Sequence, residues 1–184
     1  MDKANRLCMS CGMCCDGTMF DHANVVPDEK QQVMSAGLIV NEKLGKLSFE
    51  QPCRFYCHNL CSIYEQRPAV CISYRCKLLK KMNKDEVSLD AALDKVKMLR
   101  ALQKRLAEVM PNAKHSPITS VEVYEMAATI DQQDTMQRKQ YGIFLMSATK
   151  FIGMLTDHFW HKESPNSAAE ENSPDILQNP NHGM

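Results

Sequence analysis

The chain begins with a dense group of cysteines, and their spacing limits what it can fold into. The group consists of Cys8, Cys11, Cys14 and Cys15, so two residues separate each of the first three thiols from the next. Two-residue gaps let a tight turn direct several sulfurs at one centre, and three such ligands completed by a distant fourth are typical of bacterial iron–sulfur sites. Zinc ribbons use the same gap, but usually as two separated pairs. The spacing therefore predicts a metal site that organises the start of the chain.

Two of these cysteines, Cys14 and Cys15, are adjacent. Neighbouring side chains in an extended segment point in opposite directions. We therefore expect one of them to serve the site, and the other to face a second centre, cap the first site or pack in the interior. Gly12 provides a position without Cβ restrictions, which a loop around a metal requires.

Five further cysteines form a second group. They are Cys53, Cys57, Cys61, Cys71 and Cys76. The steps of four between the first three would line one face of a helix, but Pro52 and the short span favour successive loops that close on a site. The two cysteine groups can be halves of one site or two separate sites, and their spacing is compatible with both.

Arg67 lies in a stiff stretch between two cysteines. Pro68 fixes its own φ and biases Arg67 toward an extended conformation. Arg67 is therefore well placed to neutralise a carboxylate or the charge of a thiolate-rich cluster. A surface ion pair with Glu65 or another acidic residue is the alternative.

Cysteine usage and charge indicate the compartment and the partners. Nine cysteines cannot all pair within one chain, residues 1–7 lack the apolar segment of a secretory signal, and the longest apolar run, near residues 143–155, is too short to span a bilayer. We therefore expect a cytoplasmic protein with reduced thiols and no membrane partner. Lys+Arg and Asp+Glu are both 22, so nothing indicates nucleic acid, and the expected partner is an unknown protein.

The remaining pattern predicts a mainly α fold with an irregular cysteine-rich lobe. A short helix over residues 28–36 and a small hairpin from residues 38–40 and 46–49 follow the first cysteines. From Ser88, apolar residues recur at steps of three and four as far as Met110, which predicts an amphipathic helix.

The second half of the chain continues with helical signals. Thr119 and Glu122 form a capping box at the start of the next helical stretch, and an apolar stripe continues to Phe159. Residues 131–140 between them are almost wholly polar, so we expect two helices separated by a kink rather than one long helix.

These elements divide the chain into three parts. We expect a cysteine-cluster metal-binding domain over residues 1–80, an α-helical region over residues 81–161 and a disordered tail over residues 162–184. The helical region is expected to form a helical hairpin or a small bundle that packs on the first domain.

The cysteine motifs resemble those of the YkgJ-like cysteine-cluster family. Its CxxCxxCC domain is described as zinc- or iron-chelating, and its members are often labelled as iron–sulfur oxidoreductases. The resemblance covers about residues 8–76 and is carried by the first cysteine group with Gly17, by Pro52-Cys53-Arg54-Phe55, and by the run from Cys61 through Arg67-Pro68 to Cys71. It implies that the metal ligands are Cys8, Cys11, Cys14, Cys15, Cys53, Cys61 and Cys71, with Cys76 at a position that is often cysteine. Cys57 is an addition to the family pattern.

Two functions fit this pattern best. The first is a protein that holds iron as an iron–sulfur cluster, with an electron-transfer or sensing role: three thiolates of the first group and one of the second complete a 4Fe-4S site, and the others can hold a second cluster. The alternative is a zinc-stabilised protein-interaction module without catalytic activity, in which eight thiolates form two tetrahedral sites.

Other functions have weaker support. Copper handling through Met9 and Met13 is a third idea, but packing explains these residues better, since 13 methionines are scattered along the chain. No Ser–His–Asp set and no phosphate-binding glycine loop is found. If the protein is an enzyme, an iron–sulfur oxidoreductase is the class that the motifs suggest, because the metal centre is the one candidate for its chemistry.

Overall fold

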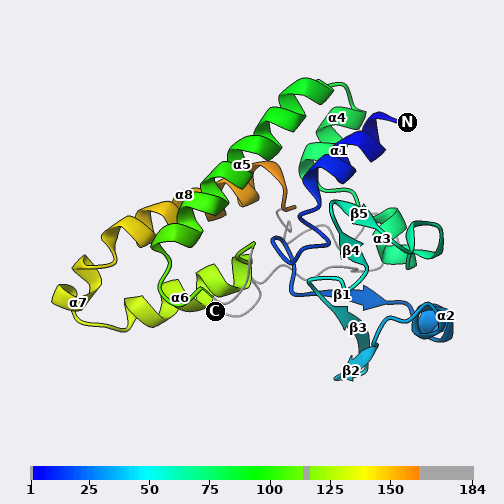
Figure 1. Cartoon of the computed structure of the whole chain (residues 1–184), viewed down its shortest axis with the longest axis horizontal. Coiled ribbons are helices and arrows are strands. Elements are labelled where there is room, and N and C mark those ends of the chain that lie inside the picture. The colour runs from blue at the N-terminus through cyan, green and yellow to red at the C-terminus, as the bar shows by residue number, and fades with distance from the viewer. Residues whose placement is uncertain (1, 114–116, 162–184) are drawn as a thin grey trace, which may run out of the picture.

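The computed structural model describes residues 2–113 and 117–161, and the predicted tail over residues 162–184 lies outside this range. Helices dominate the described part, and a small β-sheet lies beside them (Figure 1). The expected mainly α character is therefore present. No helix in the described part is long and apolar enough to cross a membrane.

The first cysteines lie on a helix. Helix α1 (Lys3–Cys11) carries Cys8 and Cys11 one turn apart, where the sequence analysis expected a loop. The helix ends at Gly12, which has φ +65° and donates its N–H to the carbonyl of Cys8. This left-handed conformation suits glycine, as expected for that position.

A three-stranded antiparallel sheet follows. It contains β1 (His22–Val25), β2 (Asn41–Lys43) and β3 (Lys46–Glu50) in the order β1-β3-β2. The 3-10 helix η1 (Pro27–Glu29) and helix α2 (Lys30–Ser35) connect the first two strands and confirm the predicted helix. The predicted hairpin is β2–β3, with its first strand at 41–43 instead of 38–40, because Leu38 turns into the apolar core instead of pairing.

The second cysteine group folds into short elements. Strands β4 (Tyr56–Cys57) and β5 (Leu60–Cys61) form a tight hairpin whose two turn residues, His58 and Asn59, both have positive φ. The 3-10 helix η2 (Tyr64–Gln66), helix α3 (Ala69–Ser73) and helix α4 (Lys77–Asn83) follow.

The long helices begin where the sequence predicts. Helix α5 (Leu89–Val109) starts after Ser88, whose hydroxyl accepts the N–H of Ala91 at 3.2 Å. Helix α6 (Ser120–Asp131) starts with the predicted Thr119–Glu122 capping box. The polar stretch separates α6 from α7 (Thr135–Lys139) and α8 (Gly142–His158), so this region divides as expected.

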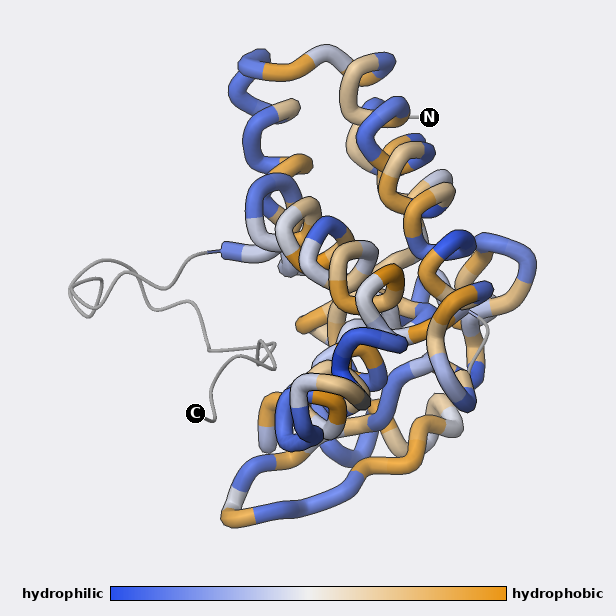
Figure 2. The backbone as a smooth tube through the Cα atoms, turned by 90° about the vertical axis from the view of Figure 1, so that its left-hand side faces the viewer, coloured by the Kyte–Doolittle hydropathy of each residue, from blue (hydrophilic) through white to orange (hydrophobic). Residues whose placement is uncertain are grey.

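Two separate apolar clusters hold these elements together. The larger one joins the first cysteine turn to α1, α4, α5, α6 and α8, and it includes Leu7, Met13, Met19, Leu99, Leu155 and Phe159. The smaller one lies against the sheet and includes Ala23, Val25, Val33, Leu47, Phe49 and Val70. Helices α5 and α8 pack along each other, and hydrophilic and hydrophobic residues alternate along them, as expected of helices with one face in the core (Figures 1 and 2).

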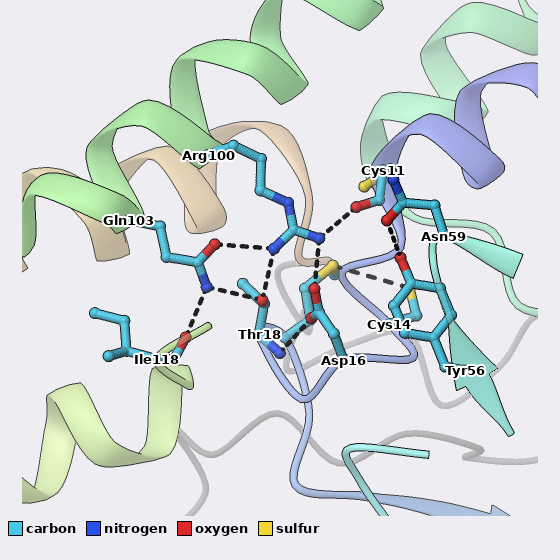
Figure 3. Close-up of polar contacts among 10 residues, drawn as sticks. Cys11, Cys14, Asp16, Thr18, Tyr56, Asn59, Arg100, Gln103 and Ile118 are labelled. Atoms are coloured by element: carbon cyan, nitrogen blue, oxygen red, sulfur yellow. Dashed lines mark hydrogen bonds and ion pairs between the residues drawn. The ribbon is translucent and has the colours of Figure 1, made fainter. Parts of the chain in front are cut away.

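A clamp from α5 holds the first cysteine turn in place (Figure 3). The Arg100 guanidinium donates to the carbonyl of Cys11 and to the carboxylate of Asp16, both at 2.5 Å. It also donates to the Thr18 hydroxyl at 3.2 Å, and Gln103 Nε2 donates to the same hydroxyl at 2.9 Å. One side chain of the helical region therefore fixes both ends of the segment that contains Cys14 and Cys15.

Replacing Arg100 by alanine tests this clamp. We expect Arg100→Ala to lower the free energy of unfolding by about 2–3 kcal/mol, because it leaves the buried carboxylate of Asp16 without its charged donor. Urea denaturation measures the loss. The matched control is Lys97→Ala on the same helix, whose exposed pair with Asp94 should contribute less than about 0.5 kcal/mol. Equal stabilities of the two variants would contradict the clamp.

Candidate metal centre

The predicted ligands surround one cavity. Its volume is about 590 Å³, and every cysteine except Cys57 lines it. All nine cysteines are free thiols, so no disulfide competes for them. The structure therefore gathers the eight predicted ligands and leaves out the cysteine that the family pattern does not contain.

Four of these thiols come from α1, the turn after it and the start of α4. Cys8 and Cys11 lie on α1, which contacts α4. Cys76 is the N-cap of α4, and its sulfur accepts the N–H of Leu79 at 3.4 Å. Cys11, Cys14 and Cys76 all pack against the larger apolar cluster.

The other four come from the next residue of the turn and from the second cysteine group. The carbonyl of Cys15 accepts the N–H of Cys53 at 2.7 Å. Tyr56 donates its N–H to the carbonyl of Cys53 at 2.9 Å and pairs with Cys61 in the β4–β5 hairpin. Cys71 lies on α3 and, like Cys53, packs against the smaller apolar cluster.

Burial keeps the thiols of the first four protonated in the metal-free protein. Burial raises the pKa of Cys11 to about 12, with further increases from the charges of Cys76 and Cys8. Burial and the charges of Cys76, Cys11, Cys15 and Cys8 raise the pKa of Cys14 well above its ordinary value. Burial also raises the pKa of Cys76 to about 11. A metal that binds here must displace these protons.

Burial also raises the pKa of Cys15, Cys53 and Cys71 in the second four. Burial raises the pKa of Cys15 to about 12, and the charges of Cys71, Cys53 and Cys61 add to it. Burial, with the charges of Cys53 and Cys61, raises the pKa of Cys71 to about 12. Cys53 and Cys61 therefore lie close enough to Cys15 and Cys71 for their charges to interact.

Positively charged side chains oppose this effect: Arg100 lowers the pKa of Cys11 and Arg54 that of Cys53, although burial dominates at both thiols. The Arg67 guanidinium stacks on the Tyr64 ring, 3.5 Å from its centroid, and Arg67 Nε donates to the Tyr64 carbonyl at 2.8 Å. Burial raises the pKa of Cys8, while the positive charges of Arg75 and Arg67 lower it. Arg67 also lowers the pKa of Cys71, where burial dominates. Arg67 thus lies beside the thiols, as the sequence analysis suggested.

Cys57 is placed differently from the other cysteines. It is exposed in the β4–β5 hairpin, and its sulfur lies 3.1 Å from Nδ1 of the adjacent His58. Neither side chain lines the cavity.

The sequence analysis missed the residues that hold the first turn, namely Arg100, Gln103, Asp16 and Thr18. A signal existed for Gln103, which interrupts the apolar stripe of α5 between Leu99 and Leu106 and is only 3% exposed. A polar side chain buried in such a stripe needs a partner, and Gln103 Nε2 finds one in the carbonyl of Ile118 at 2.6 Å as well as in Thr18.

The donor set fits a metal that prefers sulfur. Thiolates are the ligands of iron–sulfur clusters and of many zinc sites. Within residues 2–113 and 117–161, no group of three or more Cys, His, Asp or Glu side chains stands in the arrangement of a single bound ion. The fit therefore rests on the kind and number of the donors around the cavity.

Comparison with known proteins identifies the cysteine-rich part. Residues 7–92 match the model of the CxxCxxCC family, which is described as a "putative zinc- or iron-chelating domain". This match confirms the resemblance to the cysteine-cluster family, and the description supports a chelated metal, naming zinc and iron together. No curated protein and no solved structure matches the chain.

The buried thiols predict a pH dependence of the metal-free protein. Because the pKa values of Cys11, Cys15 and Cys71 are raised from 9.0 to about 12, the unfolded chain binds fewer protons than the folded chain between these values. The free energy of unfolding is therefore fully retained below about pH 9 and falls as the pH rises toward 12.

Urea denaturation of reduced, metal-free protein at about pH 8 and about pH 10.5 measures this fall. The double variant Cys15→Ala and Cys71→Ala is the control, and its stability should depend less on pH because two of the buried thiols are gone. An identical pH dependence in both proteins would show that these thiols do not carry the effect.

Proposed function

We propose that this protein holds iron, as an iron–sulfur cluster, through its cysteine thiolates and serves in electron transfer or sensing. The observation that carries the proposal is the cavity of about 590 Å³ with eight thiols on its wall. A single ion needs no such open space, because its ligating sulfurs lie about 2.3 Å from it. A cluster of several iron and sulfide ions needs room between the thiolates.

The surroundings of the thiols suit a negatively charged cluster. Arg67 and Arg75 bring positive charge next to Cys8, and Arg67 also acts on Cys71. The N–H of Leu79 points at the sulfur of Cys76. Positive charge and N–H···S contacts raise the reduction potential of an iron–sulfur cluster and favour its reduced form.

Cys8, Cys11, Cys14, Cys15, Cys53, Cys61, Cys71 and Cys76 are the proposed ligands. When bound, an iron–sulfur cluster supplies one-electron transfer at a potential set by its surroundings. The chain's own part is to exclude water, which it does by packing Cys11, Cys14 and Cys76 against the larger apolar cluster. Electron transfer requires a protein partner that donates or accepts the electron.

A zinc-stabilised interaction module is the second candidate. It is favoured by the number of thiols on the cavity wall, since eight thiolates complete the tetrahedral shells of two zinc ions. In that case the helices after residue 77 would supply the binding surface for a partner protein, and the metal would stabilise the fold without taking part in chemistry.

Spectroscopy of anaerobically purified protein separates the two candidates. An iron–sulfur protein is coloured, with broad visible absorbance from sulfide-to-iron charge transfer, and it contains acid-labile sulfide. Elemental analysis should then find iron in excess of zinc. Colourless protein that contains zinc and no labile sulfide would replace the first candidate by the second.

Cysteine substitutions test the ligand assignment. The double variant Cys11→Ser and Cys71→Ser removes one thiol from each set of four, and we expect it to lose most of the bound metal. Cys57→Ser is the matched control and should retain the metal content of the unmodified chain, because Cys57 is exposed and does not line the cavity. Metal retained by the double variant, or lost by Cys57→Ser, would contradict the assignment.

A further inference from the structure

We propose that the eight thiols form two separate metal centres of four thiolates each. The first centre consists of Cys8, Cys11, Cys14 and Cys76, and the second consists of Cys15, Cys53, Cys61 and Cys71. This inference rests on the proposed metal-binding function and concerns the number and composition of the centres, so it applies to iron and to zinc.

The packing of the protein separates the two sets. Cys11, Cys14 and Cys76 pack against the larger apolar cluster, which is built from the helices. Cys53 and Cys71 pack against the smaller apolar cluster, which is built from the sheet and its neighbours. Each set is therefore supported by its own core.

The backbone brings each set together by independent contacts. Helices α1 and α4 are in contact and carry three members of the first set, including Cys76 at the N-cap of α4. In the second set, the N–H of Cys53 bonds the carbonyl of Cys15, and the β4–β5 hairpin returns Cys61 to the residues after Cys53. Helix α3, which carries Cys71, contacts strand β1.

The sets meet at the Cys14–Cys15 peptide. The N–H groups of Cys15 and Asp16 both donate to the carbonyl of Gly12, at 2.9 and 3.1 Å, which makes a tight turn after α1. Arg100 fixes the two ends of this turn through Cys11 and Asp16. In this turn Cys14 packs against the larger cluster, whereas the backbone of Cys15 bonds Cys53.

Apart from the effect of Cys15 on the adjacent Cys14, the electrostatic effects on the thiols follow the division that the backbone contacts and the packing show. Besides burial, the charges that raise the pKa of Cys15 most come from Cys71, Cys53 and Cys61. For Cys11, the thiols that raise the pKa are Cys76 and Cys8. The pKa of the Tyr74 hydroxyl is raised first by burial and then by the charges of Cys14, Cys76 and Cys11. Tyr74 therefore lies next to the first set.

Four thiolates satisfy a metal centre of either kind. Four is the number of ligands in a tetrahedral zinc site and the number of cysteines that hold a 4Fe-4S cluster. The eight thiols on the cavity wall divide into two such sets without a remainder, and Cys57 lies outside both. Adjacent ligands in one chain also imply that the two centres lie close together, because consecutive Cα atoms are about 3.8 Å apart.

Single substitutions, one in each set, test the division. Cys76→Ser is suited to the first set because serine is a good N-cap and preserves the start of α4. Cys61→Ser is suited to the second because Cys61 is only partly buried in the short hairpin. Metal content is measured on anaerobically purified full-length protein, circular dichroism checks folding, and Cys57→Ser is the control.

We expect each single variant to retain about half of the metal of the unmodified chain and the double variant to retain almost none. If iron is present, electron paramagnetic resonance of the reduced protein should show broadening from two interacting clusters, and either single variant should lose this broadening.

Loss of all metal in a folded single variant would show one shared centre and overturn the division, and so would full retention. These outcomes are distinct from failure of the iron proposal. Colourless protein with about two zinc ions per chain, halved in each variant, would reject iron and retain the two centres.

Discussion

The ion pair between Arg100 and Asp16 is the interaction on which the geometry of the thiols depends. It is largely shielded from water, with Arg100 27% and Asp16 8% exposed, so solvent does not readily replace it. Because the same guanidinium also bonds the Cys11 carbonyl, it fixes both ends of a turn only a few residues long. The planar fork of arginine permits this, whereas a lysine ammonium would offer one point charge. Helix α5 of the helical region therefore helps to position the cysteines.

Burial and metal binding place opposite demands on the thiols. A buried neutral thiol packs as a small apolar group, but a metal ligand must be a thiolate. In the metal-free protein burial prevails, and the pKa values of Cys11, Cys14 and Cys15 are all raised. The groups that favour the thiolate are four arginines, Arg54, Arg67, Arg75 and Arg100, and a few backbone N–H groups, so the charge of the metal itself must supply most of the compensation. Binding of the metal and release of the thiol protons are thus linked.

The parts of the structure that the sequence could predict are those with local signals. The three- and four-residue periodicity located α5, and the Thr119–Glu122 pair located the start of α6. Helix α1 was missed because Leu7 is its one buried residue, which leaves no apolar stripe to detect. The contacts of Arg100 with Asp16 and Cys11 were missed because these partners are far away in the sequence, at separations of 84 and 89 residues. Nothing in the local sequence marks such a pairing. The family resemblance indicated the cysteines that line the cavity, while the proposed division into two sets rests on the packing.

The adjacent pair Cys14–Cys15 gives the two proposed centres a shared electrostatic environment. The charge of Cys15 contributes to the raised pKa of Cys14, so a thiolate in one set makes a thiolate in the other less favourable. A metal centre held by four thiolates keeps the sign of this effect, because four negative charges exceed the two positive charges of a zinc ion, and a 4Fe-4S cluster with its four thiolates is also an anion. A filled first set therefore raises the barrier to deprotonating the second set. Arg67 acts in the opposite direction, since its positive charge reaches Cys8 in one set and Cys71 in the other. Two centres joined by one peptide bond are thus expected to fill one after the other, even though separate apolar clusters support them.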